Sequence, residues 1–471
     1  MKTNLSELMK VLDIKCDEKV EIKGISEDSR DIKKDWLFIS RIENAREYQK
    51  AVIQKGGYVV CEEVSQQANC YGFANFKKLD EMINLYYGDL CRDMFIIGIT
   101  GTSGKSSVAD IVSQMLRKID KKVMRIGSDG VDYNNHLLST SNTTPSLFKL
   151  AYYFKEALRQ EMEYIVMEVS SHAIDQNRIK LINFDMIVYT NITSDHLDYH
   201  LTTLNYQNTK FKLRNYLKDN GVIVINSDDK ILHHLYELSN HKCITYGKDG
   251  SHFKLDDIIC SSNHSSFICN GMKFETPLIG AVNVYNIAIM IVIGRVLELT
   301  YEQLQAVAKL IKPVPGRMEV VYNEEFLVWL DYAHSEDALK RILQFANRVK
   351  KNRIITLIGC GGERDQGKRF GMAHIAGLYS DLVIFTADNS RGETLVNIFN
   401  DMDINSVENH DVFENRYYAI KHAIAIAKKG DIIIIAGRGN ESIQKIGTQS
   451  IHFSDREVIK QVVIGRIHPC I

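Results

Sequence analysis

The stretch FIIGITGTSGKSSVADIVSQML, residues 95–116, joins three patterns that decide the fold around it. An apolar run of strand length leads into a turn of small residues that carries Lys105, and an amphipathic helix pattern follows. Glycines in such a turn let successive backbone N–H groups point at phosphate oxygens, and the helix N-terminus adds its dipole. The stretch therefore predicts a phosphate-binding loop between a buried strand and a helix.

The loop itself carries the short pattern G-x-x-G-K-S, formed by Gly101, Gly104, Lys105 and Ser106. The longer G-x-x-x-x-G-K-[ST] pattern is not met, because Ile99 stands in place of its first glycine. In such a loop the lysine reaches the β- and γ-phosphates of a nucleotide, and the hydroxyl ligates Mg²⁺. The alternative is a strand-to-helix turn that binds nothing.

Length and composition set limits on the rest of the chain. With 471 residues, 45% apolar and 25% charged, the sequence indicates a globular protein of two or three domains. A net charge of −1 gives no general attraction to nucleic acid, so no nucleic-acid partner is expected. No apolar run approaches eighteen residues and the first ten residues lack an apolar signal core, so membrane insertion and export are not expected. Nine scattered cysteines indicate reduced thiols, which predicts a cytoplasmic protein.

Strand-like and helix-like runs alternate from about residue 95, with strands in MFIIGIT, EYIVMEV, DMIVYTNI and GVIVINSDD. After PVP at 313–315 the alternation resumes with EFLVWLDYAH, RIITLIGCGG, DLVIFTADNS and DIIIIAGRGN. This order is typical of parallel sheets with helices on both faces. The stretch 243–278 is expected to form short antiparallel strands, and a small mixed unit with strands in DWLFIS and GGYVVCEE comes first. We therefore predict an α/β fold of three domains, residues 1–93, 94–312 and 313–471.

Polar residues follow two of the buried runs at the point where each run ends. Glu168 closes EYIVMEV, and His196 follows DMIVYTNI. A carboxylate at the carboxyl end of a strand beside the phosphate loop is well placed for Mg²⁺. Lys210 lies farther on, in a helical pattern where a solvated lysine is the commoner case.

The ordered set of these motifs resembles the Mur ligases, the ATP-dependent amino-acid ligases of peptidoglycan precursor synthesis. The resemblance runs from SEDSR (26–30) to HFSDREV (452–458) and is greatest for the MurE branch, which adds the third residue to UDP-MurNAc-L-Ala-D-Glu. It implies a small N-terminal mixed α/β UDP-binding domain, a central P-loop ATPase-like domain with a parallel sheet, and a C-terminal Rossmann-like α/β domain that binds the amino acid.

The resemblance also implies ATP and Mg²⁺ as cofactors. The implied ATP-binding residues are Gly101, Thr102, Ser103, Gly104, Lys105, Ser106, Ser107, Asn286, Arg317, Asp331 and His334. The implied metal ligands are Ser106, Glu168, His196 and Lys210, the last as a carbamylated lysine (N6-carboxylysine). Lys105, Glu168, His196 and Lys210 form the implied catalytic set.

The two other substrates have their own implied contacts. For UDP-MurNAc-L-Ala-D-Glu these are Ser29, Asn142, Thr143, Thr144, Ser170, Gln176 and Arg178. For the incoming amino acid they are Arg364, Asp388, Asn389, Ser390, Arg391, Gly437 and Glu441. Arg391 and Arg364 favour a substrate with an extra carboxylate, and Glu441 favours one with a distal amine, so meso-diaminopimelate is expected. Ser390 stands where the family usually has proline, and GRGNE where it usually has Gly-Lys-Gly-His-Glu, which leaves the identity of the amino acid open.

The implied reaction is attack of the D-Glu carboxylate on the ATP γ-phosphoryl group, followed by attack of an amine on the acyl phosphate. Four alternatives remain: a MurE-like paralogue that ligates L-lysine or another amino acid or serves another pathway, a non-catalytic nucleotide-binding relic, a folate-polyglutamate ligase, and a P-loop kinase or GTPase. A monomer is expected.

Overall fold

The computed structural model describes residues 3–40, 46–61, 68–72, 76–134, 136–140, 142–193, 195–237 and 239–467. Its internal contacts divide the chain into two compact units, Met1–Tyr246 and Gly247–Ile471. The domain boundaries near 93 and 313 remain predictions. In the described ranges, no helix is both long enough and apolar enough to cross a membrane.

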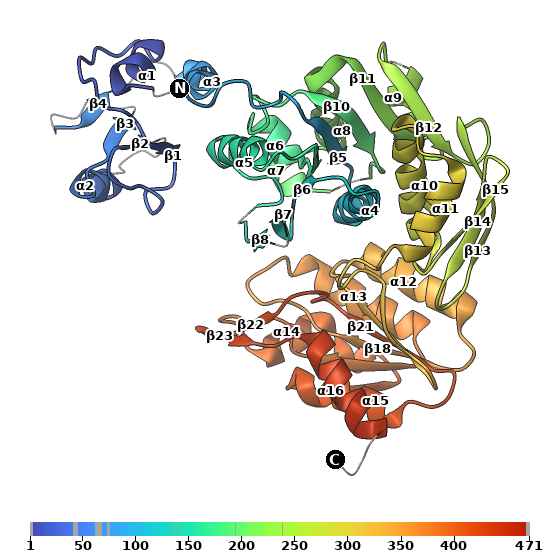
Figure 1. The fold of residues 1–471 in the computed structure, drawn as a ribbon. Helices are drawn as coiled ribbons and strands as arrows, with labels where there is room; N and C mark the ends of the chain where they lie inside the picture. The colour runs from blue at the N-terminus through green and yellow to red at the C-terminus, as the bar shows by residue number, and fades with distance from the viewer. Residues whose placement is uncertain are drawn as a thin grey trace. The chain divides into compact units, whose positions relative to one another are not determined.

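The first unit begins with a small parallel sheet in the order β1-β2-β3-β4 (Figure 1, blue). The two strands predicted in this region are confirmed as β2 and β3. The elements are α1 (Leu5–Val11), β1 (Gly24–Ser26), β2 (Trp36–Ser40), α2 (Arg46–Gln54), β3 (Tyr58–Cys61), β4 (Cys70–Gly72), η1 (Phe76–Lys78) and α3 (Leu79–Tyr87).

A larger sheet follows in the same unit, with the strand order β12-β11-β10-β5-β9-β6-β7-β8. Its pairs from β12 to β6 are parallel, as the alternating pattern predicts, and β7 and β8 add an antiparallel edge. The strands are β5 (Phe95–Thr100), β6 (Val123–Gly127), β7 (Gly130–Tyr133), β8 (His136–Leu138), β9 (Tyr164–Glu168), β10 (Phe184–Tyr189), β11 (Leu217–Asn226) and β12 (Lys242–Gly247). The helices are α4 (Lys105–Lys118), α5 (Leu147–Arg159), α6 (Ser171–Asp175), α7 (Leu197–His200), α8 (Thr203–Phe211), η2 (Lys212–Tyr216) and α9 (Lys230–Glu237).

The prediction of antiparallel strands over 243–278 is wrong at its beginning. Strand β12 pairs in parallel with β11. The connection between them is α9, and a helical crossover is the way in which parallel neighbours are joined. The rest of the stretch is confirmed, since β13 (Phe253–Cys260), β14 (Ser265–Cys269) and β15 (Met272–Thr276) pair antiparallel.

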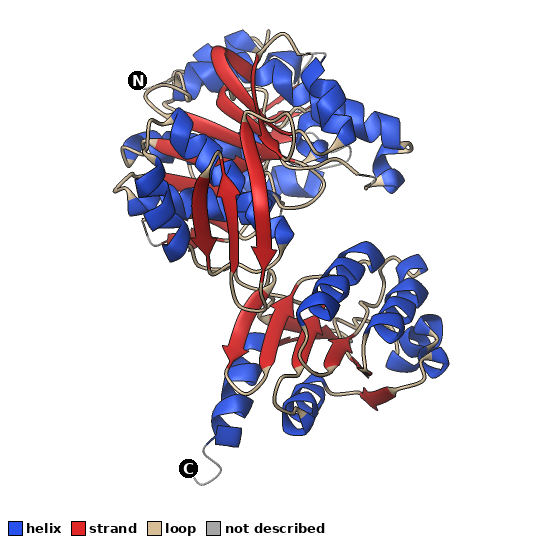
Figure 2. Cartoon of the chain, turned by 90° about the vertical axis from the view of Figure 1, so that its right-hand side faces the viewer, coloured by secondary structure: helices blue, strands red, loops and turns tan. Residues whose placement is uncertain are grey.

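The second unit contains a six-stranded sheet in the order β16-β17-β21-β18-β19-β20, parallel except at β16. Apolar cores lie on both faces of this sheet, and Figure 2 shows helices on both. The strands are β16 (Glu319–Asn323), β17 (Leu327–Asp331), β18 (Ile354–Ile358), β19 (Leu382–Thr386), β20 (His410–Phe413) and β21 (Ile432–Ala436), with a separate hairpin of β22 (Ile443–Ile446) and β23 (Gln449–His452). The helices are α10 (Ala281–Val296), α11 (Tyr301–Leu310), α12 (Glu336–Val349), α13 (Gly367–Tyr379), α14 (Leu395–Met402), η3 (Ile404–Ser406), α15 (Arg416–Ile426) and α16 (Asp455–Ile467).

Both parallel sheets gather the predicted site residues at the carboxyl ends of their strands. The phosphate loop follows β5, and Glu168 ends β9. In the second unit Asp331 ends β17, and the segment that begins at Asp388 follows β19. Ligands of open α/β sheets bind outside this edge, so the fold places the candidate residues where such sites occur.

Candidate active site

The phosphate loop lies between β5 and the first turn of α4. Gly104 precedes the helix with φ +85°, a left-handed conformation that glycine adopts without strain. Lys105 is the first residue of α4, and its Nζ donates hydrogen bonds to the carbonyls of Gly101 at 2.9 Å and Thr102 at 3.0 Å. The lysine therefore folds back over the loop, on the side where the first N–H groups of α4 have no intrahelical acceptor. This geometry suits an anion.

The loop is anchored to the residues that follow β10. The N–H groups of Thr102 and Ser103 donate to the backbone and side-chain oxygens of Asn191, at 2.8 and 3.0 Å. Thr190 Oγ1 in turn donates to the carbonyl of Ser103 at 2.7 Å. These two N–H groups are therefore satisfied within the protein, which leaves the first turn of α4, including Ser106 and Ser107, as the part that faces a phosphate.

Glu168 holds a buried carboxylate beside this turn. Its side chain is 1% exposed, Oε2 accepts a hydrogen bond from Ser106 Oγ at 2.9 Å, and Oε1 accepts one from the Ser128 N–H at 2.9 Å. Burial raises the pKa of the Glu168 carboxyl above its usual 4.5. The sequence did not single out Ser128, although its place directly after β6 in GSDG could have indicated it. A carboxylate and a hydroxyl at one point fit the oxygen preference of Mg²⁺.

Lys210 extends from α8 to the same loop and is 1% exposed, so it is not the solvated helix lysine of the commoner case. Its Nζ donates to the Gly101 carbonyl at 2.9 Å, the oxygen that also accepts from Lys105. Burial, and then the charge of Lys105, lower the pKa of Lys210 well below its usual value. The neutral amine is thus favoured at this position.

His196 lies on the outer side of these residues, with a side chain 49% exposed and φ +50°. Its Nε2 is 3.6 Å from Asp195 Oδ2, and its ring packs edge-on against His172 at 4.9 Å. Among the described side chains no group of three or more His, Cys, Asp or Glu could hold a metal ion. A metal here would take few protein ligands and complete its shell with phosphate oxygens, the arrangement common for Mg²⁺.

Five of the seven residues expected at the acceptor substrate form one group linked by hydrogen bonds, and these are Thr143, Thr144, Ser170, Gln176 and Arg178. Arg178 donates from Nε and Nη2 to Gln176 Oε1 and from Nη1 to the Thr144 carbonyl at 2.9 Å. The Ser170 N–H donates to Thr144 Oγ1 at 3.0 Å, and Thr143 Oγ1 lies 3.0 Å from Ser128 Oγ. The group therefore reaches from Arg178 to Ser128, which contacts Glu168.

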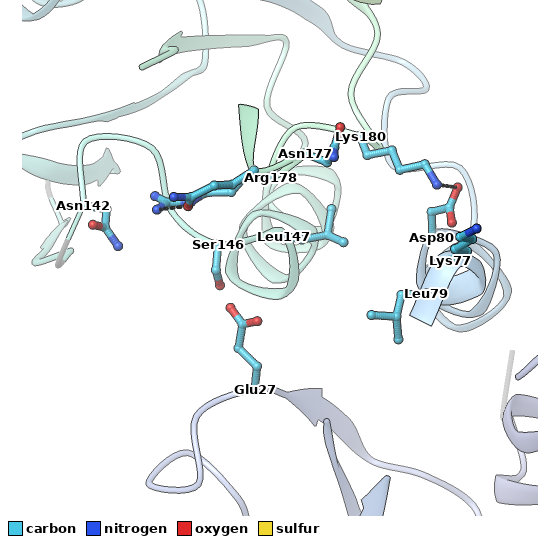
Figure 3. A pocket seen from close by; sticks show the side chains of 11 residues that line it. Glu27, Lys77, Leu79, Asp80, Asn142, Ser146, Leu147, Asn177, Arg178 and Lys180 are labelled. Carbon is cyan, nitrogen blue, oxygen red and sulfur yellow. Dashed lines mark hydrogen bonds and ion pairs between the residues drawn. The ribbon is translucent and has the colours of Figure 1, made fainter. Parts of the chain in front are cut away.

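Two cavities of the first unit adjoin this group. One, of about 680 Å³, is lined by Asn142, Gln176 and Arg178 and also by Glu27. Figure 3 shows the Glu27 carboxylate pointing toward the segment that carries Ser146. Lys180 and Asp80, which also line this cavity, form an ion pair at 2.9 Å. The second, of about 450 Å³, includes Ser29 together with Asn142. Four of the seven predicted acceptor contacts line these two cavities: Ser29, Asn142, Gln176 and Arg178. Thr143, Thr144 and Ser170 do not line either one.

In the second unit, three of the four remaining ATP candidates lie together. Asp331 accepts hydrogen bonds from the N–H groups of Met318 at 2.6 Å and Ala333 at 2.7 Å, and burial raises its pKa. The Arg317 guanidinium lies over the Tyr332 ring at 4.5 Å, and His334 Nδ1 lies 2.9 Å from the Tyr332 carbonyl. Burial lowers the pKa of His334, so its neutral form is favoured.

The fourth ATP candidate, Asn286, lies on α10. It is buried, and its Nδ2 donates to Asn283 Oδ1 at 3.0 Å.

The amino-acid candidates gather at the carboxyl ends of β19 and β21. Asp388, Asn389 and Ser390 are all buried. Asn389 Nδ2 donates to Glu441 Oε2 at 2.8 Å, and Gly437 approaches Asp388 so closely that a Cβ would lie 2.9 Å from its Oδ2. The structure thus brings these five residues into one cluster.

Arg391 and Arg364 lie at the edge of the cluster. Arg391 Nη1 donates to the carbonyls of Gly362 at 2.7 Å and Asn389 at 3.3 Å. Arg364 is exposed, and both arginines border Gly361, where a Cβ would lie 3.2 Å from Arg391 Nη1 and 3.7 Å from Arg364 Cγ. Two cations therefore flank the loop that joins β18 to α13.

Sequence reasoning missed two buried arginines that hold this cluster. Arg369 pairs with Glu393 through both of its Nη atoms at 2.7 Å and donates to the Gly361 carbonyl at 3.0 Å. Arg438 donates to Asn389 Oδ1 at 3.2 Å. Arg438 stands in the GRGNE segment, where the family usually has lysine at this position. That difference is the one sequence feature that could have indicated Arg438.

Known proteins resemble this chain over nearly its full length. A family model described as the Mur ligase middle domain matches residues 99–294, and one described as the Mur ligase, glutamate ligase domain matches residues 316–439. The UDP-N-acetylmuramoyl-L-alanyl-D-glutamate–2,6-diaminopimelate ligase of Bacillus cereus is 34% identical in an alignment of 470 positions that covers 96% of each chain.

Solved structures agree with these matches. The structure of a UDP-N-acetylmuramoyl-L-alanyl-D-glutamate–2,6-diaminopimelate ligase has a TM-score of 0.69 and 26% identity, and the match covers 99% of this chain and 100% of that one. The MurF ligase of Thermotoga maritima in complex with ADP shares the fold, with a TM-score of 0.64 and 16% identity over 94% of this chain and 96% of that one. This chain belongs to the Mur ligase family.

Proposed function

We propose that this protein is an ATP-dependent ligase that adds meso-diaminopimelate to UDP-MurNAc-L-Ala-D-Glu. One observation carries the choice of amino acid. Arg391 and Glu441 bond to the two ends of the same residue, Asn389, the arginine to its carbonyl at 3.3 Å and the glutamate to its carboxamide at 2.8 Å. A cation and an anion that both bond to one residue match a substrate end that carries a carboxylate and an amine, and meso-diaminopimelate has such an end in addition to the amine that reacts.

The family and the names of the relatives support the rest of the substrate set. Relatives that are about one-third identical over nearly the whole chain bear the name of the diaminopimelate-adding ligase. A lysine side chain would bring an ammonium without a carboxylate to Arg391, and like charges repel. L-lysine is therefore the weaker candidate.

The first half of the reaction would take place at the phosphate loop. Lys105 and the first turn of α4 would bind the β- and γ-phosphates of ATP and stabilise charge as the γ-phosphoryl group moves to the D-Glu carboxylate. Arg178 would hold the acceptor through its guanidinium fork, which suits a phosphate or carboxylate. Mg²⁺, when bound by Ser106, Glu168, His196 and a carbamylated Lys210, would neutralise phosphate charge.

Lys210 is suited to that modification. Carbamylation requires a neutral amine, and burial favours the neutral form at Lys210. The product is an anion at a place where a free ammonium would stand beside Lys105 and repel a cation.

The second half of the reaction would form the amide. The amino acid would be held by Asp388, Asn389, Ser390, Arg391, Gly437 and Glu441, with Arg364 at the rim. Its neutral amine would attack the acyl phosphate, the C–N bond would form, and phosphate would leave with the electron pair of the C–O bond. Positioning of the amine accounts for most of the rate that such a step needs.

The domain boundaries belong to the same proposal. Residues 1–93 would contact the uridine end of the acceptor through Ser29, residues 94–312 would bind ATP, and residues 313–471 would bring Arg317, Asp331 and His334 to the nucleotide. We propose the monomer as the working form.

The test is release of ADP by the full chain with UDP-MurNAc-L-Ala-D-Glu, ATP and Mg²⁺, measured across meso-diaminopimelate, L-lysine, L-ornithine and L-alanine. We expect the highest kcat/KM with meso-diaminopimelate. Activity with L-lysine and none with diaminopimelate would contradict the substrate. No ADP release with any amino acid would favour a nucleotide-binding relic.

A further inference from the structure

Arg438 is a fully buried cation next to the amino-acid cluster, and the proposed reaction does not use it directly. It follows β21, is 0% exposed, and stands between Gly437 at φ +108° and Gly439 at φ +50°. Side chains other than glycine rarely adopt these conformations. The chain is therefore bent on both sides of Arg438, which turns its side chain into the protein.

The Arg438 guanidinium donates hydrogen bonds in two directions. Nη1 donates to Asn389 Oδ1 at 3.2 Å. Nη2 donates to the carbonyls of Ile443 at 3.1 Å and Phe453 at 3.0 Å, which lie at the two ends of the β22–β23 hairpin. The arginine thus joins the base of the hairpin to the Asn389 side chain.

These bonds decide which way the Asn389 carboxamide faces. Oδ1 accepts from Arg438 Nη1 and also from the Lys445 N–H at 2.8 Å. Only an oxygen can accept, so the NH₂ group must occupy the opposite side. There Nδ2 donates to Glu441 Oε2 at 2.8 Å, while Tyr332 OH lies 3.5 Å from Oε1.

We propose that Arg438 is a positioning residue for the incoming amino acid, because it fixes the Asn389 carboxamide and thereby orients the Glu441 carboxylate. Arg438 acts through Asn389 and also directly on the Glu441 carboxylate, whose Oε2 lies 3.8 Å from Arg438 Nη1. It is not itself placed among the groups that hold the substrate. This inference rests on the proposed function, in which Glu441 binds the amine of the amino acid.

The contacts seen in this chain suit arginine at position 438, where the family usually has lysine. The two Nη atoms are separate and rigidly placed, so one reaches Asn389 while the other reaches two carbonyls. A lysine ammonium is a single point and cannot serve both directions. Asn389 Oδ1 would then keep only the Lys445 N–H as a donor, so the carboxamide that donates to Glu441 would be held less firmly.

The experiment is a double-mutant cycle in the full-length enzyme with Arg438→Lys, Asn389→Ala and the double variant. For each protein, KM for meso-diaminopimelate, KM for ATP, kcat and the thermal midpoint are measured. We expect R438K to raise KM for diaminopimelate about tenfold, the effect of losing one hydrogen bond to a charged group, with KM for ATP unchanged. In the N389A background the same change should add less than about twofold, since residues that act in one chain are not additive.

Arg353→Lys is the matched control. Arg353 is also ion-paired, to Asp431 at 2.7 Å, but precedes β18 at the opposite end of the sheet. R353K should leave KM for diaminopimelate unchanged. If R438K does not fold, Arg438→Gln, which keeps one amide donor, replaces it in the cycle.

The outcomes separate the two proposals. ADP release by the wild-type enzyme tests the function alone. Additive effects of R438K and N389A, or an unchanged KM for diaminopimelate in R438K, would overturn the role of Arg438 while the function stands. A lower thermal midpoint without a change in KM would show a structural role only, and would also overturn it.

Discussion

Glu168 is almost completely buried, and burial raises its pKa above 4.5, so its charged form is disfavoured in the folded protein without ligands. Burial acts in the same way on Lys210, a cation: it lowers the pKa and so disfavours the charged form. At both residues the site therefore disfavours the charge that a glutamate or a lysine carries on a protein surface. Such groups are frequent at functional sites, where a bound cation favours the carboxylate of a buried acid and a neutral lysine amine can be modified.

Glu168→Gln is expected to stabilise the unliganded protein at neutral pH. The folded pKa of Glu168 is raised, so ionisation costs folding free energy as pH rises from 4.5 through that pKa. A glutamine does not ionise. Its advantage should be absent below about pH 4.5, appear above it, and reach about 1.4 kcal/mol for each unit by which the pKa is raised.

Urea denaturation of both proteins between pH 4 and 8 measures this difference. The variant should be inactive as a ligase over the whole range. An advantage that grows toward acid pH would contradict the assignment of burial as the cause.

Arg391→Ala is expected to raise KM for diaminopimelate by tenfold or more, because a charge-assisted contact to a carboxylate is removed. KM for ATP should not change. Lys428→Ala, which removes an exposed cation elsewhere in the second unit, serves as the control. Equal KM values for wild type and R391A in steady-state assays would remove Arg391 from the binding site.

The residues of this site lie at the ends of strands, and Gly127 at the end of β6 leaves room for the Glu168 side chain. A Cβ on Gly127, the last residue of β6, would lie 2.1 Å from Glu168 Oε1. Strand β6 pairs with β9, which Glu168 ends. The two strands can be neighbours with the carboxylate between them only because position 127 has no side chain.

Gly127→Ala is therefore expected to displace the Glu168 carboxylate and to lower kcat at least tenfold, with a loss of about 1–3 kcal/mol in stability from overpacking. Gly465→Ala is the matched control. It lies in α16 with no atom within 4 Å of the added Cβ, so it should be neutral or stabilising by up to about 1 kcal/mol. Wild-type kcat in G127A would contradict the proposed role of Glu168.

Most strands could be predicted because their apolar runs are continuous and each is followed by a helical pattern. Strand β12 was assigned to the wrong pairing because KCITYG has little apolar pattern, so nothing local shows that α9 makes a crossover. The pairing of a long, strongly patterned strand can be predicted from the rules for strand connections, whereas that of a short, weakly patterned strand cannot.

Site residues that follow strands could be predicted from the sequence. Residues whose role depends on a contact with a residue far away in the sequence could not. Lys105, Glu168 and Asp388 all stand at strand ends and were found from the sequence or the family resemblance. Ser128 and Arg438 act through bonds to residues 40 and 49 positions away, which no local pattern contains. Roles that depend on such pairs need coordinates.

At the scale of the molecule, the ATP candidates are divided between the two compact units. The phosphate loop belongs to the first unit, and Arg317, Asp331 and His334 belong to the second. A nucleotide that binds the phosphate loop stabilises the folded form of the first unit, because anything that binds only the folded form shifts the folding equilibrium.

A non-hydrolysable ATP analogue with Mg²⁺ at about 100 times its Kd is expected to add roughly 2.7 kcal/mol to stability. Differential scanning calorimetry should show the unfolding transition of the first unit move upward by a few degrees. Lys105→Ala should abolish the shift at the same concentration. An unchanged transition in the wild-type chain would contradict nucleotide binding at the phosphate loop.

The Gly101 carbonyl, which accepts hydrogen bonds from both Lys105 and Lys210, has a consequence for the heat of nucleotide binding. An arriving phosphate takes Lys105 from acceptors that already satisfy it, so the enthalpy in a titration calorimeter records an exchange of acceptors and not a new bond. In the protein with unmodified Lys210, this lysine stays on the carbonyl, which therefore keeps a donor when Lys105 leaves. Replacing Lys210 with methionine should therefore change the enthalpy of binding as well as catalysis, although Lys210 need not touch the nucleotide.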